Sequence, residues 1–149
     1  MRILIQRVTA ANVVVDDALI GAIDHGLLLL IGVTHGDAEA TEDRMADKLI
    51  KLRIFNDEKG LMNRSVIDVA GGILAVSQFT LYADAKGGNR PSYTAAARPE
   101  QASPAFDRFV AKLAARLGKP VPTGIFGADM KITLVNDGPV TIWLDSETL

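Results

Sequence analysis

The longest apolar run in the chain reads Leu27-Leu28-Leu29-Leu30-Ile31-Gly32-Val33 and follows Gly26. It contains no polar residue on either face of a possible strand, a pattern typical of a strand covered on both sides. The run is also far shorter than the roughly 20 residues that a membrane-spanning helix needs. It therefore predicts a strand at the centre of a folded core, and we expect no membrane span.

Shorter alternating or apolar segments, bounded by turn residues, predict the other strands. These segments cover residues 3–8, 12–15, 19–23, 72–82, 130–135 and 140–145. We expect a turn at Asp16-Asp17, a polar loop over residues 83–98, and a short connection over residues 136–139. Most of the strands are close neighbours in sequence, which favours antiparallel pairing.

Two amphipathic stretches predict helices. Asp37 can cap the first, whose apolar stripe has the i, i+4, i+7 spacing of Met45, Leu49 and Leu52. The second has Ser103 as N-cap, Pro104 at its first position and Gly118 at its end. Its apolar face consists of Phe106, Val110, Leu113 and Leu117. We predict one α/β domain over residues 1–149, with a mixed, largely antiparallel sheet that is barrel-like or doubled and two main helices packed on one side.

Composition narrows the chemistry and the location. The chain has 149 residues, no cysteine, two histidines and a net charge of -2. Thiolate nucleophiles are excluded and a histidine-rich zinc site is disfavoured, so we expect neither a metal nor another cofactor. The charge argues against a protein that coats duplex nucleic acid, and we expect no DNA partner, but it permits a local basic patch for one end of an RNA. The N-terminus lacks a signal-peptide pattern, so the expected location is cytoplasmic.

The first candidate segment, Ser77-Gln78-Phe79-Thr80-Leu81-Tyr82, places two hydroxyls where a buried strand meets a loop. In a regular strand Ser77 and Thr80 would face opposite sides, so at most one could act as a nucleophile. Neither has a neighbouring base in the sequence, and a Ser-His-Asp triad would require His25 or His35 to approach in space. Alternatively, both hydroxyls only satisfy local backbone groups.

Three further segments each have a structural and a functional interpretation. Asn136-Asp137-Gly138-Pro139-Val140-Thr141 is an ordinary turn, or a rigid cis Gly-Pro element that aims carbonyl oxygens outward. The glycine-rich loop with Lys86 and Arg90 is solvated, or it contacts phosphates or a base. Residues 124–130 pack at a bulge, or they form one wall of a tight pocket.

Together, the segments at 77–82 and 136–141 resemble the two signature motifs of the D-aminoacyl-tRNA deacylase family. The resemblance extends over nearly the whole chain. It includes residues 1–8, Leu52-Arg53-Ile54-Phe55, Asn89-Arg90-Pro91-Ser92 and Phe126-Gly127-Ala128-Asp129-Met130. The resemblance implies an editing hydrolase that acts on the aminoacyl-tRNA 3′ end, releases D-amino acids and glycine, and spares L-amino acids.

The same resemblance implies a homodimer in which a cis Gly138-Pro139 element enters the partner's active site and excludes L-amino acids sterically. Arg7 would hold that element in place, and Phe126, Ala128 and Met130 would line the pocket. Ser77, Gln78, Phe79 and Thr80 would form the catalytic segment. Backbone N–H groups of Phe79 and Thr80 would polarise the ester carbonyl while the ribose 2′-OH assists, although the Thr80 hydroxyl is an alternative nucleophile. A non-catalytic RNA-end binding module and a general serine or threonine esterase are the rival functions.

Overall fold

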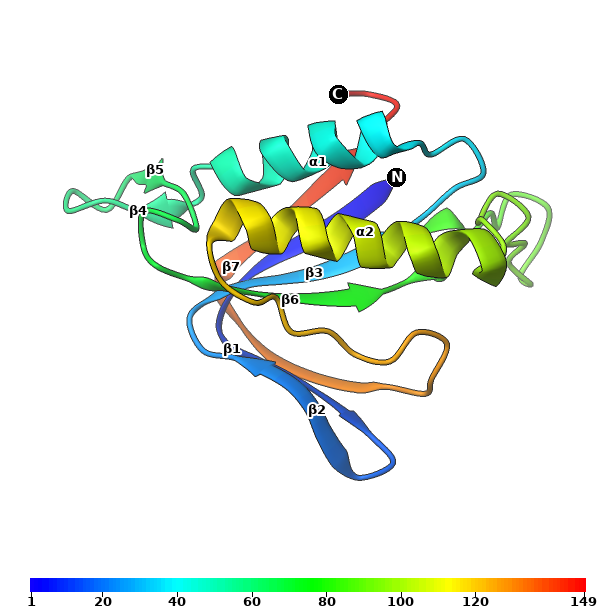
Figure 1. Cartoon of the computed structure of the whole chain (residues 1–149), viewed down its shortest axis with the longest axis horizontal. Coiled ribbons are helices and arrows are strands. Elements are labelled where there is room, and N and C mark those ends of the chain that lie inside the picture. Colours follow the sequence, from blue (N-terminus) through cyan, green and yellow to red (C-terminus); the bar gives the residue numbers. More distant parts are fainter.

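The computed structural model describes residues 1–149, which form a curled sheet and a layer of two helices on one of its faces (Figure 1). The helices are α1 (Glu39–Lys51) and α2 (Pro99–Leu117). The sheet strands are β1 (Arg2–Val15), β2 (Ala18–Ile23), β3 (Gly26–Gly32), β6 (Gly72–Ser77) and β7 (Lys131–Asp145). A small hairpin of β4 (Phe55–Asn56) and β5 (Met62–Arg64) was not predicted. The predicted fold class is confirmed.

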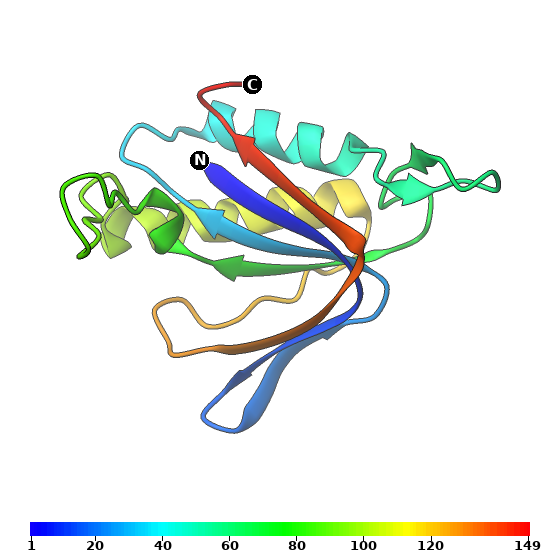
Figure 2. The ribbon, with the colours of Figure 1, turned by 180° about the vertical axis from the view of Figure 1, so that it is seen from behind.

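The sheet follows the order β2-β1-β3-β6, and β7 also pairs with β1. Only β3 and β6 run parallel, while β1 pairs antiparallel with β2, β3 and β7. The first half of β1 lies beside β3 and its second half lies beside β2, so the sheet curls where β1 bends (Figure 2). The predicted turn at Asp16-Asp17 joins β1 to β2, and both residues have positive φ.

Four of the predicted strands form only two strands in the structure. Residues 3–8 and 12–15 belong to one bent strand, β1, and residues 130–135 and 140–145 both belong to β7. The predicted connection over residues 136–139 is therefore part of a strand. It stays in the sheet because β1 pairs with β7 on both sides of it, through Gln6 with Thr141 and Val8 with Asn136.

The central run is buried on both faces, as predicted. Leu27, Leu29 and Ile31 of β3 belong to the main core under the helices, with Phe106 and Phe109 of α2. Leu28 points the other way, into a second core inside the curl of the sheet. Full burial of one such side chain contributes about 2 kcal/mol, so this strand alone strongly favours a sheet with two covered faces.

Both predicted helix starts were wrong. Ala38 is the N-cap of α1, and the Asp37 carboxylate instead accepts hydrogen bonds from the Met1 amino group and the Thr34 N–H, at 2.5 and 2.8 Å. The second helix begins at Pro99, and Pro104 lies inside it. Either proline suits a first helical turn, but Ala102 and Ala105 are buried and their burial favours the longer helix. The predicted end at Gly118 is confirmed by its φ of 77°.

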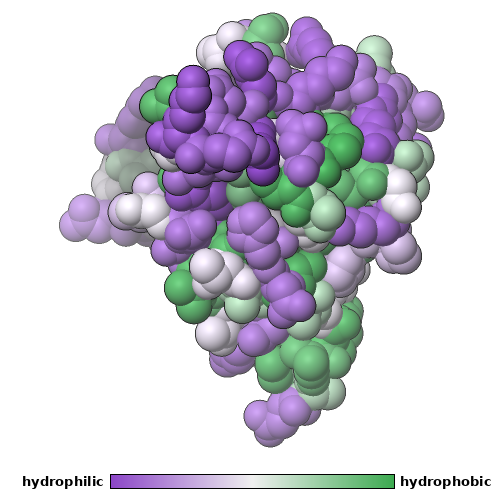
Figure 3. Space-filling model, turned by 90° about the vertical axis from the view of Figure 1, so that its left-hand side faces the viewer, coloured by the Kyte–Doolittle hydropathy of each residue, from purple (hydrophilic) through white to green (hydrophobic).

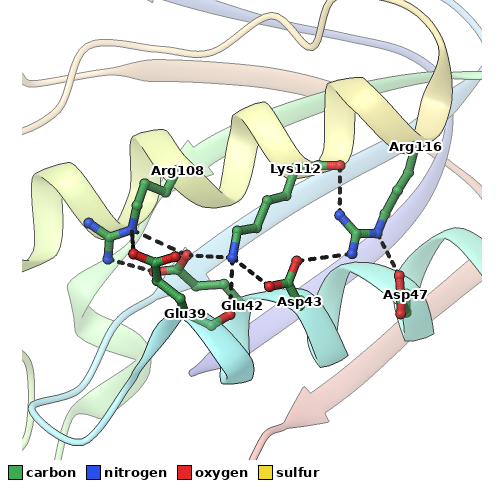
Figure 4. Close-up of polar contacts among 7 residues, drawn as sticks. All are labelled: Glu39, Glu42, Asp43, Asp47, Arg108, Lys112 and Arg116. Atoms are coloured by element: carbon green, nitrogen blue, oxygen red, sulfur yellow. Dashed lines mark hydrogen bonds and ion pairs between the residues drawn. The ribbon is translucent and has the colours of Figure 1, made fainter.

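A row of ion pairs links α1 to α2 (Figure 4). The buried Glu42 carboxylate lies 2.7 Å from Arg108 and 3.3 Å from Lys112. Asp43 is half exposed and lies 2.8 Å from Lys112 and 3.0 Å from Arg116. Hydrogen bonds from Lys112 and Arg116 hold the pKa of Asp43 below its ordinary value of 3.8. The row therefore fixes the register of the two helices by charge, whereas their apolar faces hold them to the sheet.

We expect Asp43→Asn to lower the free energy of unfolding at pH 7. Because the pKa of Asp43 is lower in the folded chain, its contribution is fully present above its ordinary value of 3.8. The contribution is lost as the pH falls below that value, so the two proteins should converge in acid. Urea unfolding between pH 7 and pH 2.5 measures the difference. Asp129→Asn is the control, because its ion pair with Lys131 is exposed on both sides. A difference that stays constant down to pH 2.5 would contradict this role.

Candidate active site

A cavity of about 550 Å³ opens between the end of β6, the first half of α2 and the segment before β7. Its wall is mainly apolar. It brings together six of the residues predicted from the sequence: Ser77, Gln78, Phe79, Phe126, Ala128 and Met130. Segments from the middle and the end of the chain thus meet at one cavity.

The predicted strand over residues 72–82 ends at Ser77, and a 3₁₀ turn, η1 (Phe79–Tyr82), follows. The alternation that separated Ser77 from Thr80 on opposite faces therefore does not apply beyond Ser77. Gln78 is the last residue anchored to the sheet, because its N–H donates to the Ile31 carbonyl at 2.8 Å. Its side-chain amide donates to the Thr80 hydroxyl at 2.5 Å.

The backbone N–H groups of Phe79 and Thr80 make no hydrogen bond within the chain. The first residues of a helical turn have no carbonyl partner before them, which leaves these two donors unpaired. Phe79 lies at the cavity, where its half-exposed ring packs edge to face with Tyr93 at 5.1 Å between centroids. Phe79 lines the cavity and Thr80, next to it, does not, so the turn places two adjacent unpaired backbone donors at the edge of an apolar pocket.

The far wall of the cavity is the segment before β7. Gly127 has a φ of 76°, and the Ala128 N–H donates to the Ile125 carbonyl at 3.2 Å. The segment therefore contains a tight turn. Phe126 also packs against the main core, whereas Met130 packs against the second core. Side chains of this segment therefore both pack against the two cores and line the cavity.

Neither histidine lines the cavity. His25 packs edge to face against Phe55, and His35 Nε2 lies 3.0 Å from the Thr94 carbonyl oxygen. No carboxylate or amine lines the cavity either. A serine or threonine nucleophile here would have no base, so the triad alternative is not supported by the geometry.

Arg98 is the one cation on the cavity wall, and it was not predicted as a site residue. It closes the polar loop and serves as the N-cap residue of α2, so its only sequence signal was its place at the loop end. The predicted RNA contacts, Lys86 and Arg90, lie on the exposed part of the same loop and outside the wall. The loop itself is closed by paired hydrogen bonds between Asp84 and Ser92.

Gly138 and Pro139 lie at an irregularity in the β1–β7 ladder, and the peptide bond between them is cis. Five residue steps of β7, from Asn136 to Thr141, lie opposite only two steps of β1. A bulge of this kind accommodates proline, which has no N–H for the ladder. Asn136 closes the bulge, since its Oδ1 accepts from the Val140 N–H at 2.9 Å and its Nδ2 donates to Thr141 Oγ1 at 3.0 Å.

Arg7 supports this bulge from beneath. Its side chain is almost fully buried; Nε donates to the Asp137 carbonyl at 3.0 Å and Nη1 to the Ile54 carbonyl at 2.7 Å. A Cβ placed on Gly138 would lie only 3.0 Å from Arg7 Nη2, so the arginine fits closely against the glycine.

The bulge and the cavity lie at opposite ends of the sheet. Neither Gly138 nor Pro139 lines the cavity. Figure 1 shows the bend of β7 at the left of the molecule, whereas the loop before β7 and the end of β6 lie at the right; the reversed view in Figure 2 agrees. Within one chain, the two predicted halves of the site therefore do not meet.

Unpaired backbone donors at the edge of an apolar pocket, in a small mixed α/β domain, suit an enzyme that stabilises negative charge on a carbonyl oxygen, as hydrolases of esters do. The family model described as D-Tyr-tRNA(Tyr) deacylase matches residues 4–145. A D-aminoacyl-tRNA deacylase of Chromobacterium violaceum is 60% identical, over 98% of this chain and 97% of the relative. One of Dechloromonas aromatica is 57% identical, over 99% and 98%. The chain belongs to this deacylase family of hydrolases, and the resemblance seen in the sequence is confirmed.

Solved structures agree with the fold. One titled c-Myc DNA Unwinding Element Binding Protein superposes with a TM-score of 0.91 at 38% identity, covering 97% of this chain and 98% of that one. Another, titled as a probable eukaryotic D-amino acid tRNA deacylase, has a TM-score of 0.82 at 17% identity, over 96% and 97%. The second likeness is one of fold alone.

We expect Gly32→Ala to slow deacylation by about tenfold or more, because small displacements of a catalytic segment are costly. A Cβ at Gly32 would lie 3.1 Å from the Gln78 carbonyl oxygen and 3.2 Å from Leu81 Cβ, so it would push on the turn. Gly36→Ala is the control, since nothing lies within 4 Å of its added Cβ. Hydrolysis of D-tyrosyl-tRNA and thermal unfolding are measured together. Full activity of the Gly32 variant would show that the turn tolerates displacement.

Proposed function

We propose that this chain hydrolyses the ester between a D-amino acid, or glycine, and the 3′ end of tRNA. Water adds to the ester carbonyl and the bond to the ribose oxygen breaks, which gives the free amino acid and tRNA. The observation that carries the proposal is the pair of free N–H groups at Phe79 and Thr80 beside the cavity, in a chain of this family. Donors of this kind stabilise the negative charge that develops on a carbonyl oxygen during attack.

The protein wall offers no base for this reaction, because no carboxylate, imidazole or amine lines the cavity. The vicinal 2′-OH of the substrate is therefore the group that assists the attacking water or the departing oxygen, while the protein orients the ester. The Thr80 hydroxyl accepts a hydrogen bond from Gln78, an arrangement that does not remove its proton. Thr80 accordingly contributes its backbone to the chemistry.

Chirality is read by Gly138 and Pro139 of a second copy, which enter the cavity and leave no room for an L side chain. Three observations support this arrangement: the bulge is exposed, Arg7 and Asn136 hold it in place, and it does not line the cavity of its own chain. A rigid backbone at this position rejects L-amino acids by steric clash, and it needs no contact with the side chain of a D-amino acid. Glycine has no side chain to reject and is released as well.

Exposed apolar side chains fit a homodimer. β7 is an edge strand along its whole length, and Val135 and Trp143 are 56% and 48% exposed on it. Leu19 and Ile20 are exposed on β2, and Figure 3 shows apolar residues gathered on the arm of β1 and β2 above its hydrophilic tip. Surfaces of this kind mark contact areas in soluble proteins. The terminal adenosine would occupy the apolar cavity, with Arg98, Lys86 and Arg90 toward the phosphates.

The decisive assay compares D-tyrosyl-tRNA with L-tyrosyl-tRNA at equal concentrations. Release of D-tyrosine with L-tyrosine retained is the expected result. Binding without release would identify an RNA-end binding module, and release of both would identify a general esterase.

The same assay tests the exchange between subunits. Arg7→Ala should loosen the bulge and allow release of L-tyrosine, whereas Ala128→Trp should block the cavity and stop release altogether. A heterodimer of the two variants has one site with an intact cavity from one chain and an intact bulge from the other. D-selective release should therefore reappear in the purified heterodimer. Its failure to reappear would mean that both parts act within one chain.

Thr80→Ala should retain most of the activity, because the backbone donor remains. A D-tyrosyl-tRNA that ends in 2′-deoxyadenosine should be a poor substrate, with a rate reduced by about 100-fold or more. Single-turnover rates separate chemistry from binding in both experiments. An inactive Thr80→Ala protein that still binds tRNA would reassign the hydroxyl as the nucleophile.

A further inference from the structure

Arg2 connects three distant parts of the chain at the cavity end of the sheet. From the start of β1, its Nη1 donates to the Leu81 carbonyl in η1 at 3.1 Å, and its Nε donates to Asp145 at the end of β7 at 2.9 Å. The guanidinium also lies over the Tyr82 ring, 4.4 Å from the ring centroid, and 5.7 Å from that of Trp143. Arg2 does not line the cavity. Any effect of Arg2 on the reaction must therefore pass through the turn.

The turn has few other fixed points. Its N-terminal side is held by the Gln78 N–H on the Ile31 carbonyl, and its own hydrogen bonds run from Leu81 to Gln78 and from Ala83 to Thr80. On its C-terminal side, the turn is held to the sheet by the Leu81 carbonyl, which accepts a hydrogen bond from Arg2. A planar guanidinium that donates in two directions fixes orientation as well as distance, which an ammonium does not.

The contact between the Arg2 guanidinium and Tyr82 involves the aromatic ring and not the hydroxyl. The residue is 4% exposed, and its hydroxyl is buried without a hydrogen-bond partner. Burial, followed by the charges of Asp37 and Asp145, raises the pKa of Tyr82, so the phenol stays neutral. The ring therefore serves as a flat support for the guanidinium, and its hydroxyl is dispensable for that purpose.

We propose that Arg2 is a positioning residue for deacylation: it holds the Leu81 carbonyl so that the N–H groups of Phe79 and Thr80 keep their direction toward the ester. The inference rests on the proposed backbone-donor mechanism. Arg2 acts on the rate of the chemical step, because donors that are misdirected still leave the cavity free to bind the tRNA end. It does not act on chirality, since the bulge at Gly138 is held by Arg7 at the other end of the sheet.

The test compares four variants with the wild-type chain under steady-state conditions on D-tyrosyl-tRNA. Arg2→Gln should lower kcat by about tenfold or more and change KM by less than about threefold, as expected for an interaction needed only in the transition state. Arg2→Lys, which can reach one acceptor at a time, should recover part of the lost kcat. Tyr82→Phe should behave as wild type, because it keeps the ring and removes only an unpaired hydroxyl.

Asp145→Asn separates positioning from stability. It removes the charge that pairs with Arg2 but keeps an oxygen that can accept from Nε, so the guanidinium still donates in both directions. The variant should therefore lower the thermal midpoint and keep kcat. All variants are assayed well below their midpoints and with L-tyrosyl-tRNA as well, which each should continue to reject. Wild-type kcat in Arg2→Gln, or an equal loss of kcat in Asp145→Asn, would overturn the inference. An inactive wild-type chain would instead overturn the proposed function.

Discussion

The antiparallel pair of β1 and β7 is the constraint on which the rest of the structure depends. β1 bends between its two halves, and β7 follows the bend with a local excess of three residue steps between Asn136 and Thr141, which form a bulge. The bend curls the sheet and encloses the second core around Leu28. The excess residues carry Gly138 and Pro139 out of the ladder, where they are free of pairing yet fixed by their neighbours. The irregular pairing of these two strands thus accompanies the curvature of the fold and carries an exposed element that Arg7 and Asn136 hold in place.

Sequence patterns correctly predicted the elements whose position depends on burial. They failed where contacts between distant residues decide which of several possible residues starts a helix or pairs with a strand. The unbroken apolar run at Leu27 placed the central strand and implied its two covered faces, because both cores need it. The sequence could not show that Asp37 would be taken by the Met1 amino group rather than by a helix start. Nor could it choose between Pro99 and Pro104, since both suit a first turn and only the buried alanines of α2 decide. The bulge was predicted as a short connection between two strands, because its partner strand, β1, lies more than a hundred residues earlier in the chain.

The same distinction applies to the candidate site, where some features could be predicted from the sequence and others depend on the folded backbone. The family motifs singled out Phe79, Phe126 and Gly138, and the structure places the first two at the cavity and the third in the bulge. Period-2 alternation was the wrong rule beyond Ser77, because residues 79–82 form a 3₁₀ turn. That turn leaves two backbone donors free, which no side-chain pattern can reveal. Arg98 escaped notice because a cation at a loop end resembles any solvated arginine. Chemistry performed by backbone groups is visible in a sequence only through resemblance, and in a structure through unpaired hydrogen bonds.

β1 also joins the two ends of the site. Arg2 and Arg7 lie an odd number of residues apart, so alternation directs their side chains to opposite faces of the strand. Each donates to a backbone carbonyl in one part of the proposed site: Arg2 to Leu81 beside the cavity, and Arg7 to Asp137 in the bulge. In the proposed dimer, the strand that orients the donors of one active site therefore also holds the chiral element of the other. Because a paired strand is stiff along its length, a shift of β1 in one subunit would alter the rate at its own site and the selectivity at its partner's.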